Sequence, residues 1–204
     1  GGGLYITVST NTGSYMSGGL IAYNTATNGG GGGIYLNSVG RFNLRGGSVV
    51  SNLCDCARVN SGGGGVGVNN AATTFEMSGG LIAGNSYHAS QDDYNASDRN
   101  YKGGGGVFVH SGTFSMSGGR IEGNLPYNKF GRGAGIHYYN GTVKLSGAPY
   151  LLDDCFITST ALTATLDGRI TDRRAVCNIW APSTTLGTVV VKPDGVNVTD
   201  ATQY

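Results

Sequence analysis

Short apolar segments with a period of two recur along this chain, and glycine pairs or runs separate them. Apolar residues alternate with polar or aromatic ones, as they do in a strand with one buried face. One set of such segments is Leu4/Ile6/Val8, Ile34/Leu36, Val66/Val68, Val107/Val109 and Ile136/Tyr138. A second set is Phe42/Leu44, Phe75/Met77, Phe114/Met116 and Val143/Leu145. No segment has a helical period, so the sequence predicts an all-β chain.

The segments belong to a repeat of about 28 to 39 residues. An apolar anchor stands eight residues before an Asn or Asp in every unit, and the variation in length lies in the turns. The anchors are Met16, Leu44, Met77, Met116 and Leu145, and the polar positions are Asn24, Asn52, Asn85, Asn124 and Asp153. Such a period predicts a solenoid, in which units bury their apolar faces by stacking. We therefore expect a parallel β-helix of about five regular three-strand coils over residues 1–152, with the Asn residues stacked as an amide ladder.

The sequence changes character at Asp153, where the glycine-glycine signature ends. Four β-like runs follow, namely Phe156-Ile157, Leu162–Leu166, Ala175–Ile179 and Val189–Val191. They predict irregular coils over residues 153–204 that close the same domain. The chain begins with Gly1-Gly2-Gly3 at a coil boundary and ends in polar sequence, so we expect a segment of a longer protein.

Composition and charge limit the classes of binding partner that this chain can have. The chain has 38 Gly in 204 residues, 12% charged residues and a net charge of +1. A nucleic acid or an anionic membrane surface would require a basic face, which this balance argues against. No apolar run approaches the roughly 18 residues of a membrane span, so we expect no membrane insertion by this segment.

Two repeat units carry a resemblance to known proteins. The units GGVGVNNAATTFEMSGGLIAGN (Gly64 to Asn85) and GGGVFVHSGTFSMSGGRIEGN (Gly104 to Asn124) resemble the glycine-rich repeats of bacterial surface proteins with a right-handed parallel β-helix. They are also similar to the repeats of polymorphic outer membrane proteins, which are adhesins. The likeness extends from Gly1 to about Leu152 and implies a bacterial, secreted or surface-displayed protein that adheres or binds. The family has no common catalytic residues to transfer to this chain.

Strand alternation directs a partly aromatic strip outward on the first strand of each coil. Tyr5, Tyr35, Gly67, Phe108 and His137 share one outward position, and Thr7, Asn37, Asn69, His110 and Tyr139 share the next. Insertions at Leu53–Ser61, Ser86–Lys102 and Leu125–Arg132 follow the Asn position and should emerge on one edge beside this strip. Loops of mixed polar and aromatic composition are typical of recognition surfaces. The candidate ligand-binding residues are Tyr5, Tyr35, Phe108, His110, His137, Tyr139, Tyr87, Tyr94, Tyr101 and Tyr127. The alternative is that the aromatics only protect the sheet and that the loops are tolerated insertions.

Acidic residues give little support to catalysis. Polysaccharide lyases and hydrolases on this fold need paired carboxylates, or Asp-bound calcium beside a base. The outward positions of the first strand hold no carboxylate, and Glu76 and Glu122 fall on different strands. Asp92, Asp93 and Asp98 are candidate calcium ligands within one insertion, although their spacing matches no known calcium loop. We expect no cofactor, and a metal pair of His110 and His137 is a weak alternative.

The four cysteines lack the spacing of a zinc site. In an exported protein, a disulfide between Cys155 and Cys177 would staple the closing coil. A bridge between Cys54 and Cys56 would be a tight ring and is left open.

The leading hypothesis is a non-catalytic, extracellular or cell-surface adhesin whose loops and aromatic strip bind a glycan or a surface protein. A carbohydrate-active enzyme and a purely structural stalk are the alternatives.

Overall fold

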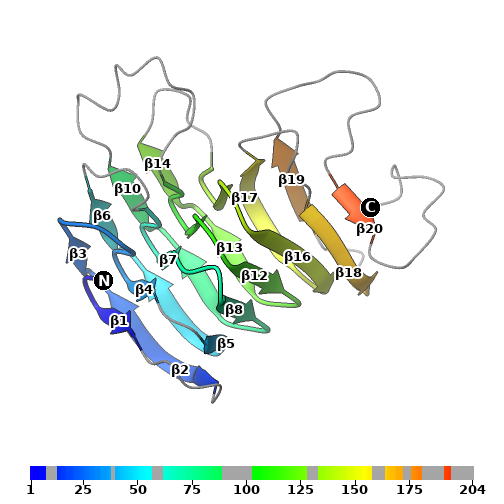
Figure 1. The fold of residues 1–204 in the computed structure, drawn as a ribbon, viewed down its shortest axis with the longest axis horizontal. Helices are drawn as coiled ribbons and strands as arrows, with labels where there is room; N and C mark the ends of the chain where they lie inside the picture. Colours follow the sequence, from blue (N-terminus) through cyan, green and yellow to red (C-terminus); the bar gives the residue numbers. More distant parts are fainter. Residues whose placement is uncertain are drawn as a thin grey trace.

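The computed structural model describes residues 1–7, 13–37, 40–56, 62–88, 103–127, 133–157, 164–171, 176–180 and 191–193. These residues form strands, turns and bends without a helix, and the strands stack in parallel as a β-solenoid of about four turns (Figure 1). The prediction of an all-β parallel β-helix is confirmed. The solenoid has about four turns, where the sequence predicted about five regular coils.

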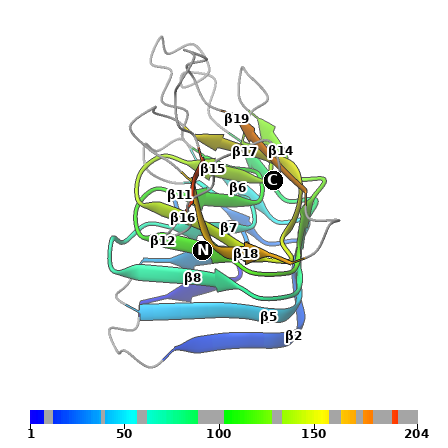
Figure 2. The ribbon, with the colours of Figure 1, turned by 90° about the vertical axis from the view of Figure 1, so that its right-hand side faces the viewer.

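Three parallel ladders of strands surround one core, seen nearly end-on in Figure 2. The first ladder contains β1 (Leu4–Ile6), β4 (Ile34–Leu36), β7 (Val66–Val68), β11 (Val107–Val109), β15 (Ile136–Tyr138) and the end of β17 (Tyr150–Ile157). The second contains the first halves of β2 (Ser14–Ala22) and β5 (Gly40–Val50), then β8 (Thr73–Met77), β12 (Thr113–Met116), β16 (Thr142–Gly147), β18 (Ala164–Ile170) and β20 (Val191–Pro193). The third contains the second halves of β2 and β5, then β9 (Leu81–Ala83), β13 (Arg120–Glu122), the start of β17 and β19 (Val176–Trp180).

A separate four-stranded parallel sheet projects from the solenoid beside the first ladder (Figure 1). Its strands are β3 (Thr25–Ala26), β6 (Leu53–Asp55), β10 (Ser86–His88) and β14 (Leu125–Tyr127). Each strand directly follows a repeated Asn. The sequence assigned β6, β10 and β14 to the beginnings of long insertions, so this sheet is an element that the prediction missed.

The interior is built from columns of equivalent apolar residues. Leu44, Met77 and Met116 are fully buried and lie opposite one another in register, while Met16 packs against them at the edge. Phe75 and Phe114 stack with ring centroids 5.1 Å apart. The predicted internal column is therefore confirmed, and parallel pairing explains it because equivalent residues of successive coils must lie side by side.

A second internal column consists of asparagine side chains. Asn24 donates from its backbone nitrogen and from Nδ2 to Oδ1 of Asn52, at 3.0 and 2.8 Å. Asn52 and Asn85 repeat this pattern toward the next coil, with Nδ2–Oδ1 distances of 2.9 and 3.0 Å. Each interior amide also donates to a main-chain carbonyl of the preceding coil, such as that of Ile21 or Val49. The predicted amide ladder is present, and its buried donors and acceptors bond to one another.

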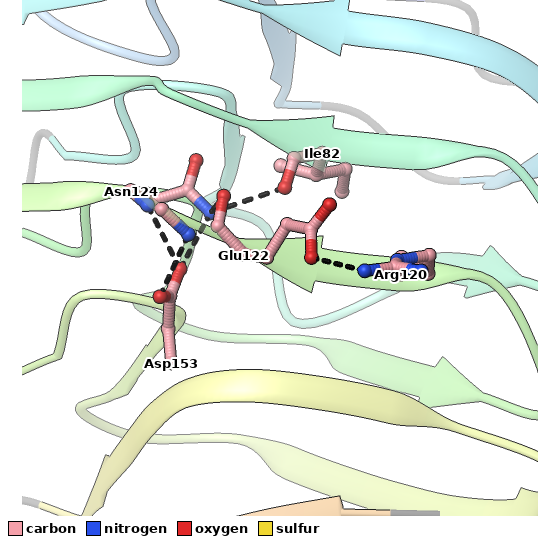
Figure 3. A network of polar contacts seen from close by, with 6 residues as sticks. Ile82, Arg120, Glu122, Asn124 and Asp153 are labelled. Atoms are coloured by element: carbon pink, nitrogen blue, oxygen red, sulfur yellow. Dashed lines mark hydrogen bonds and ion pairs between the residues drawn. The ribbon is translucent and has the colours of Figure 1, made fainter.

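Two neighbouring aspartates accept the last hydrogen bonds of the regular coils. Asp153 occupies the Asn position of the last regular coil, and its carboxylate accepts from the main chain of Gly123 and Asn124 and from Asn124 Nδ2 at 2.8 Å (Figure 3). Asp154 accepts from the main-chain nitrogens of Gly133 and Ala134 at 2.8 and 2.7 Å. A carboxylate only accepts, so Asp153 ends the series of amide donors.

The glycine runs serve mainly close packing. Gly33, Gly65 and Gly106 follow the tight turn into the first ladder, where each lies against the side chain of a ladder asparagine. A Cβ on Gly65 would lie 2.8 Å from the carbonyl oxygen of Gly106 and 3.1 Å from Asn85 Nδ2. Gly33, Gly65 and Gly106 thus pack together with the asparagine ladder as one unit.

The C-terminal strands continue the same ladders. β18 pairs with β16, β19 with β17 and β20 with β18, all in parallel, with register shifts beside Gly147 and between Leu151 and Asp154. These shifts mark where regular stacking gives way to the irregular segment.

Replacing Asn85 by Ala should destabilise the protein by about 2 to 5 kcal/mol. The change removes the acceptor of the Asn52 main-chain nitrogen and a donor to Asn124, and unsatisfied buried polar groups cost about 1 to 3 kcal/mol each. Urea unfolding measures the effect. Asn140→Ala, at an exposed position, is the matched control and should stay within about 0.5 kcal/mol of wild type. Equal unfolding midpoints for the two variants would contradict a stabilising ladder.

Gly65→Ala should lower the stability by about 1 to 3 kcal/mol, because its methyl group overlaps the neighbouring coil. Gly18→Ala provides the comparison, since a Cβ at Gly18 meets no atom within 4 Å. The same unfolding assay should find Gly18→Ala close to wild type. A Gly65→Ala protein as stable as Gly18→Ala would show that close packing does not require this glycine.

Candidate functional site

A column of uncharged polar side chains lies on the outer side of the first ladder. We call it the polar column; its members are Asn37, Asn69, His110 and Tyr139, which directly follow β4, β7, β11 and β15. All four residues are partly exposed, but the Asn69 Oδ1 and His110 Nδ1 atoms are buried. The main-chain nitrogens of Asn69, His110 and Tyr139 each donate to a carbonyl of the previous coil at 3.0 Å. The column therefore runs along the stack, with one member per coil.

Contacts between neighbouring coils order the column. Asn69 Nδ2 donates to Asn37 Oδ1 at 3.1 Å, and Asn37 Nδ2 lies 3.5 Å from the Tyr5 hydroxyl. The rings of His110 and Tyr139 stack with centroids 5.4 Å apart and an interplanar angle of 10°. Burial lowers the pKa of His110, so this ring is neutral at physiological pH.

Tyr5 and Tyr35 extend this surface toward the first coil. Their rings stack at 5.5 Å with an angle of 13°, and Tyr5 is 52% exposed. Burial raises the pKa of Tyr35, and the electrostatic effect of the neighbouring Tyr5 phenol raises this pKa further. The Tyr35 phenol therefore stays neutral. Each ring of a stacked pair covers one face of its partner. The hydroxyl edges remain as hydrogen-bonding groups, and among the described residues no ring stacks on the second face of Tyr5.

The other outward position of the first ladder, which begins with Tyr5 and Tyr35, is buried from Gly67 onward. Phe108 is 2% exposed and His137 is 0% exposed, with ring centroids 5.3 Å apart. Phe156 continues this series 5.2 Å beyond His137. The expectation of an exposed strip is therefore wrong at Phe108 and His137, which cannot contact a ligand at the surface.

The glycine runs explain this burial. A Cβ on Gly30 would lie 2.4 Å from the Tyr35 ring, and one on Gly133 would lie 3.0 Å from Cβ of His137. The main chain before each tight turn thus lies directly on the outward rings, at a distance that only glycine permits. A second layer, formed by this glycine main chain, therefore packs on the outward side of the first ladder.

A small second core belongs to the four-stranded sheet. It contains Ala26, Cys54, Cys56 and Tyr87, with Tyr87 only 1% exposed. A Cβ on Gly103 would lie 2.6 Å from the Tyr87 ring. The assignment of Tyr87 to an exposed recognition loop is wrong, because every second residue of these strands faces inward.

Cys54 and Cys56 are buried thiols in this structure. Their sulfurs donate to the carbonyl oxygens of Gly30 and Ala26 at 3.0 and 3.3 Å. A hydrogen bond with Cys56, together with burial, raises the pKa of Cys54. Cys155 is also buried, and the strand register sets it opposite Ile179 while Cys177 lies opposite Leu151. The side chain of Cys177 lies outside the described residues, so the disulfide between Cys155 and Cys177 remains a prediction.

Several other predicted residues lie outside the described part of the chain. They are Tyr94, Tyr101, Asp92, Asp93 and Asp98. Tyr127 is described only as the last main-chain position of β14. Among the described residues, no group of three or more His, Cys, Asp or Glu side chains could hold a metal ion.

The described carboxylates mostly bond to neighbouring side chains or main chain. Glu76 contacts Arg41 at 3.3 Å and Asn43 at 3.2 Å, and Glu122 bonds to Arg120. Asp55 meets His88 at 3.2 Å on the four-stranded sheet. Asp153 and Asp154 bond to the main chain, as described above.

Comparison with known proteins yields no match: no family model, no curated protein sequence and no solved structure matches this chain. Within the described ranges, no helix is long and apolar enough to cross a membrane.

Stability should fall in acid because of His137. Burial lowers the pKa of His137 from 6.5 to about 4, and a main-chain hydrogen bond with Gly103 opposes the shift only in part. The unfolded chain therefore takes up a proton below pH 6.5, which the folded chain resists until about pH 4. The contribution of His137 to the free energy of unfolding is fully present above pH 6.5. It should decline by up to about 3 kcal/mol as the pH falls to 4.

His137→Phe should remove most of this decline, since phenylalanine fits between Phe108 and Phe156 without titrating. Urea unfolding at pH 7.5 and pH 4.5 measures it. A smaller decline in the same direction should remain from His110, whose pKa is also lowered by burial. Asn140→Ala, at an exposed position, serves as the control and should retain the full pH dependence. An equally steep decline in His137→Phe would contradict the assignment.

Proposed function

We propose that this chain is a non-catalytic binding module of a bacterial secreted or cell-surface protein and that it recognises a glycan through the polar column. The observation that carries the proposal is a partly exposed, uncharged hydrogen-bonding side chain in each successive coil. Surface display rests on the resemblance of the repeats to surface adhesins.

The chemistry of the column favours carbohydrate over other ligands. Amide, neutral imidazole and phenol groups each donate and accept hydrogen bonds, as sugar hydroxyls do. A polyanion would require positive charge on the site, and the four members of the column carry none at neutral pH. A protein partner usually requires an apolar centre, whereas Phe108 and His137 are buried beneath glycine main chain.

The contacts of the carboxylates in the described ranges support a binding role. Asp153 and Asp154 end the hydrogen-bond ladders, and Glu76 and Glu122 pair with arginines on the second and third ladders. A glycosidase would require two carboxylates facing one cleft.

A double variant tests the site while keeping its rings. His110→Phe/Tyr139→Phe keeps an aromatic ring at both positions. It removes the ring nitrogens of His110 and the hydroxyl of Tyr139. His110 Nδ1 is buried without a hydrogen-bond partner, so its loss should not destabilise the fold. On a glycan array followed by calorimetry, we expect binding at least tenfold weaker than wild type, or about 1.4 kcal/mol, with an unchanged thermal midpoint.

The control for this experiment is Tyr150→Phe, which makes the same chemical change on the third ladder, where Tyr150 lies against Arg120. It should bind glycans as wild type does. Unchanged affinity in the double variant would exclude the polar column as the site. Cleavage of a bound glycan by the wild-type protein would overturn the non-catalytic assignment.

A further inference from the structure

The small core of the four-stranded sheet contains two cysteines from one strand. Cys54 lies within β6 and Cys56 directly follows it, with the main-chain nitrogen of Cys56 donating to the carbonyl oxygen of His88 at 3.2 Å. The main chain from Cys54 to Cys56 therefore stays extended along β10. Because alternate residues of a strand share one face, both cysteine side chains point into the core, where both are fully buried.

The two sulfurs contact each other. A hydrogen bond joins the thiols of Cys54 and Cys56, and their sulfurs also lie 3.0 and 3.3 Å from the carbonyl oxygens of Gly30 and Ala26. Two thiols carry only two protons, so these three contacts cannot all be hydrogen bonds at one time. The carbonyl groups direct the negative ends of their dipoles at the sulfurs, and none of the residues that form this core is charged. These surroundings favour a cation between the sulfurs.

The extended main chain disfavours a disulfide between these cysteines. Residues two apart on a strand have Cβ atoms about 6.6 Å apart, whereas a disulfide requires about 3.5 to 4.5 Å. Closing the bond would pull Cys56 away from its hydrogen bond with His88. Two metal–sulfur bonds of about 2.3 Å each span up to about 4.6 Å between the sulfurs. The side chains can meet that distance by leaning toward each other, without a change in the strand.

The number of ligands selects the class of metal. Structural zinc sites and iron–sulfur clusters take four protein ligands. Among the described residues, no group of three or more His, Cys, Asp or Glu side chains could hold a metal ion. Thiolates select soft ions such as Cu⁺, and Cu⁺ accepts two sulfur ligands in a line. A pair of neighbouring cysteines thus suits copper(I) better than zinc.

We infer that Cys54 and Cys56 bind one copper(I) ion between their sulfurs. Two copper–sulfur bonds form as the two S–H bonds break, and both protons leave to solvent without a change in oxidation state. The site lies in the core of the four-stranded sheet, apart from the polar column, so it does not depend on the proposed glycan binding.

A copper(I) titration of the full chain tests the site. Under anaerobic, reducing conditions with bicinchoninate as the competing indicator, the wild-type protein should withhold about one Cu⁺ per chain. X-ray absorption should show two sulfur ligands. Because the ion binds the folded chain, copper should also raise the thermal midpoint.

Cys54→Ser/Cys56→Ser should withhold no copper and show no rise in the thermal midpoint. Cys155→Ser removes another buried thiol, in the main core, and is the matched control, which should bind copper as wild type does. Circular dichroism checks the fold of each variant. Cys56→Ser alone leaves a single sulfur and should also lose the copper, so it replaces the double variant if that variant misfolds.

Three results would overturn the inference. They are wild-type protein with reduced thiols that withholds no copper, equal copper binding by wild type and a folded Cys56→Ser variant, and a disulfide between Cys54 and Cys56 found by peptide mapping after exposure to air.

Discussion

A buried hydrogen bond between asparagine side chains holds successive coils in register. Each interior amide accepts from the main chain and the side chain of the asparagine before it, and donates to the asparagine after it and to a carbonyl of the preceding coil. An amide supplies the two donors and the two acceptor sites that this pattern uses. Asp cannot donate, which is why Asp153 can stand at the end of the ladder but not within it. Because these amides are buried, a slip of one residue would leave several polar groups without partners.

The asparagine ladder requires glycine at the positions that pack directly against its amides. Gly33, Gly65 and Gly106 pack directly against the ladder amides, and neighbouring glycines pack against the four-stranded sheet and the outward rings. Gly33, Gly65 and Gly106 have no positive φ angle, whereas Gly30 and Gly133, which cover the outward rings, do. Their shared property is the missing Cβ, which lets two layers of main chain approach closely enough to bury rings such as His137. The abundance of glycine thus reflects packing density, and the low pKa of His137 is one consequence.

This second layer also determines which surface remains for a ligand. Both outward positions of the first ladder point away from the core, but the glycine main chain covers one of them and leaves the other partly open. The open position carries amides, a neutral imidazole and a phenol at the spacing of the coils. The proposed recognition of a glycan rests on the hydrogen-bonding edges that this stacking leaves, because Tyr35 covers one face of Tyr5 and the rings of His110 and Tyr139 cover each other.

The sequence by itself determined the strands, the core columns and the asparagine ladder, because a parallel solenoid turns a repeat in sequence directly into a contact in space. Leu44, Met77 and Asn85 could be placed from their spacing alone. The four-stranded sheet and the burial of Phe108, His137 and Tyr87 were decided only by the tertiary structure. Alternation tells which side of a strand a residue occupies, but whether another layer lies on that side depends on where the intervening chain returns. In this protein that return path is the glycine main chain, whose missing side chains leave no hydrophobic pattern in the sequence.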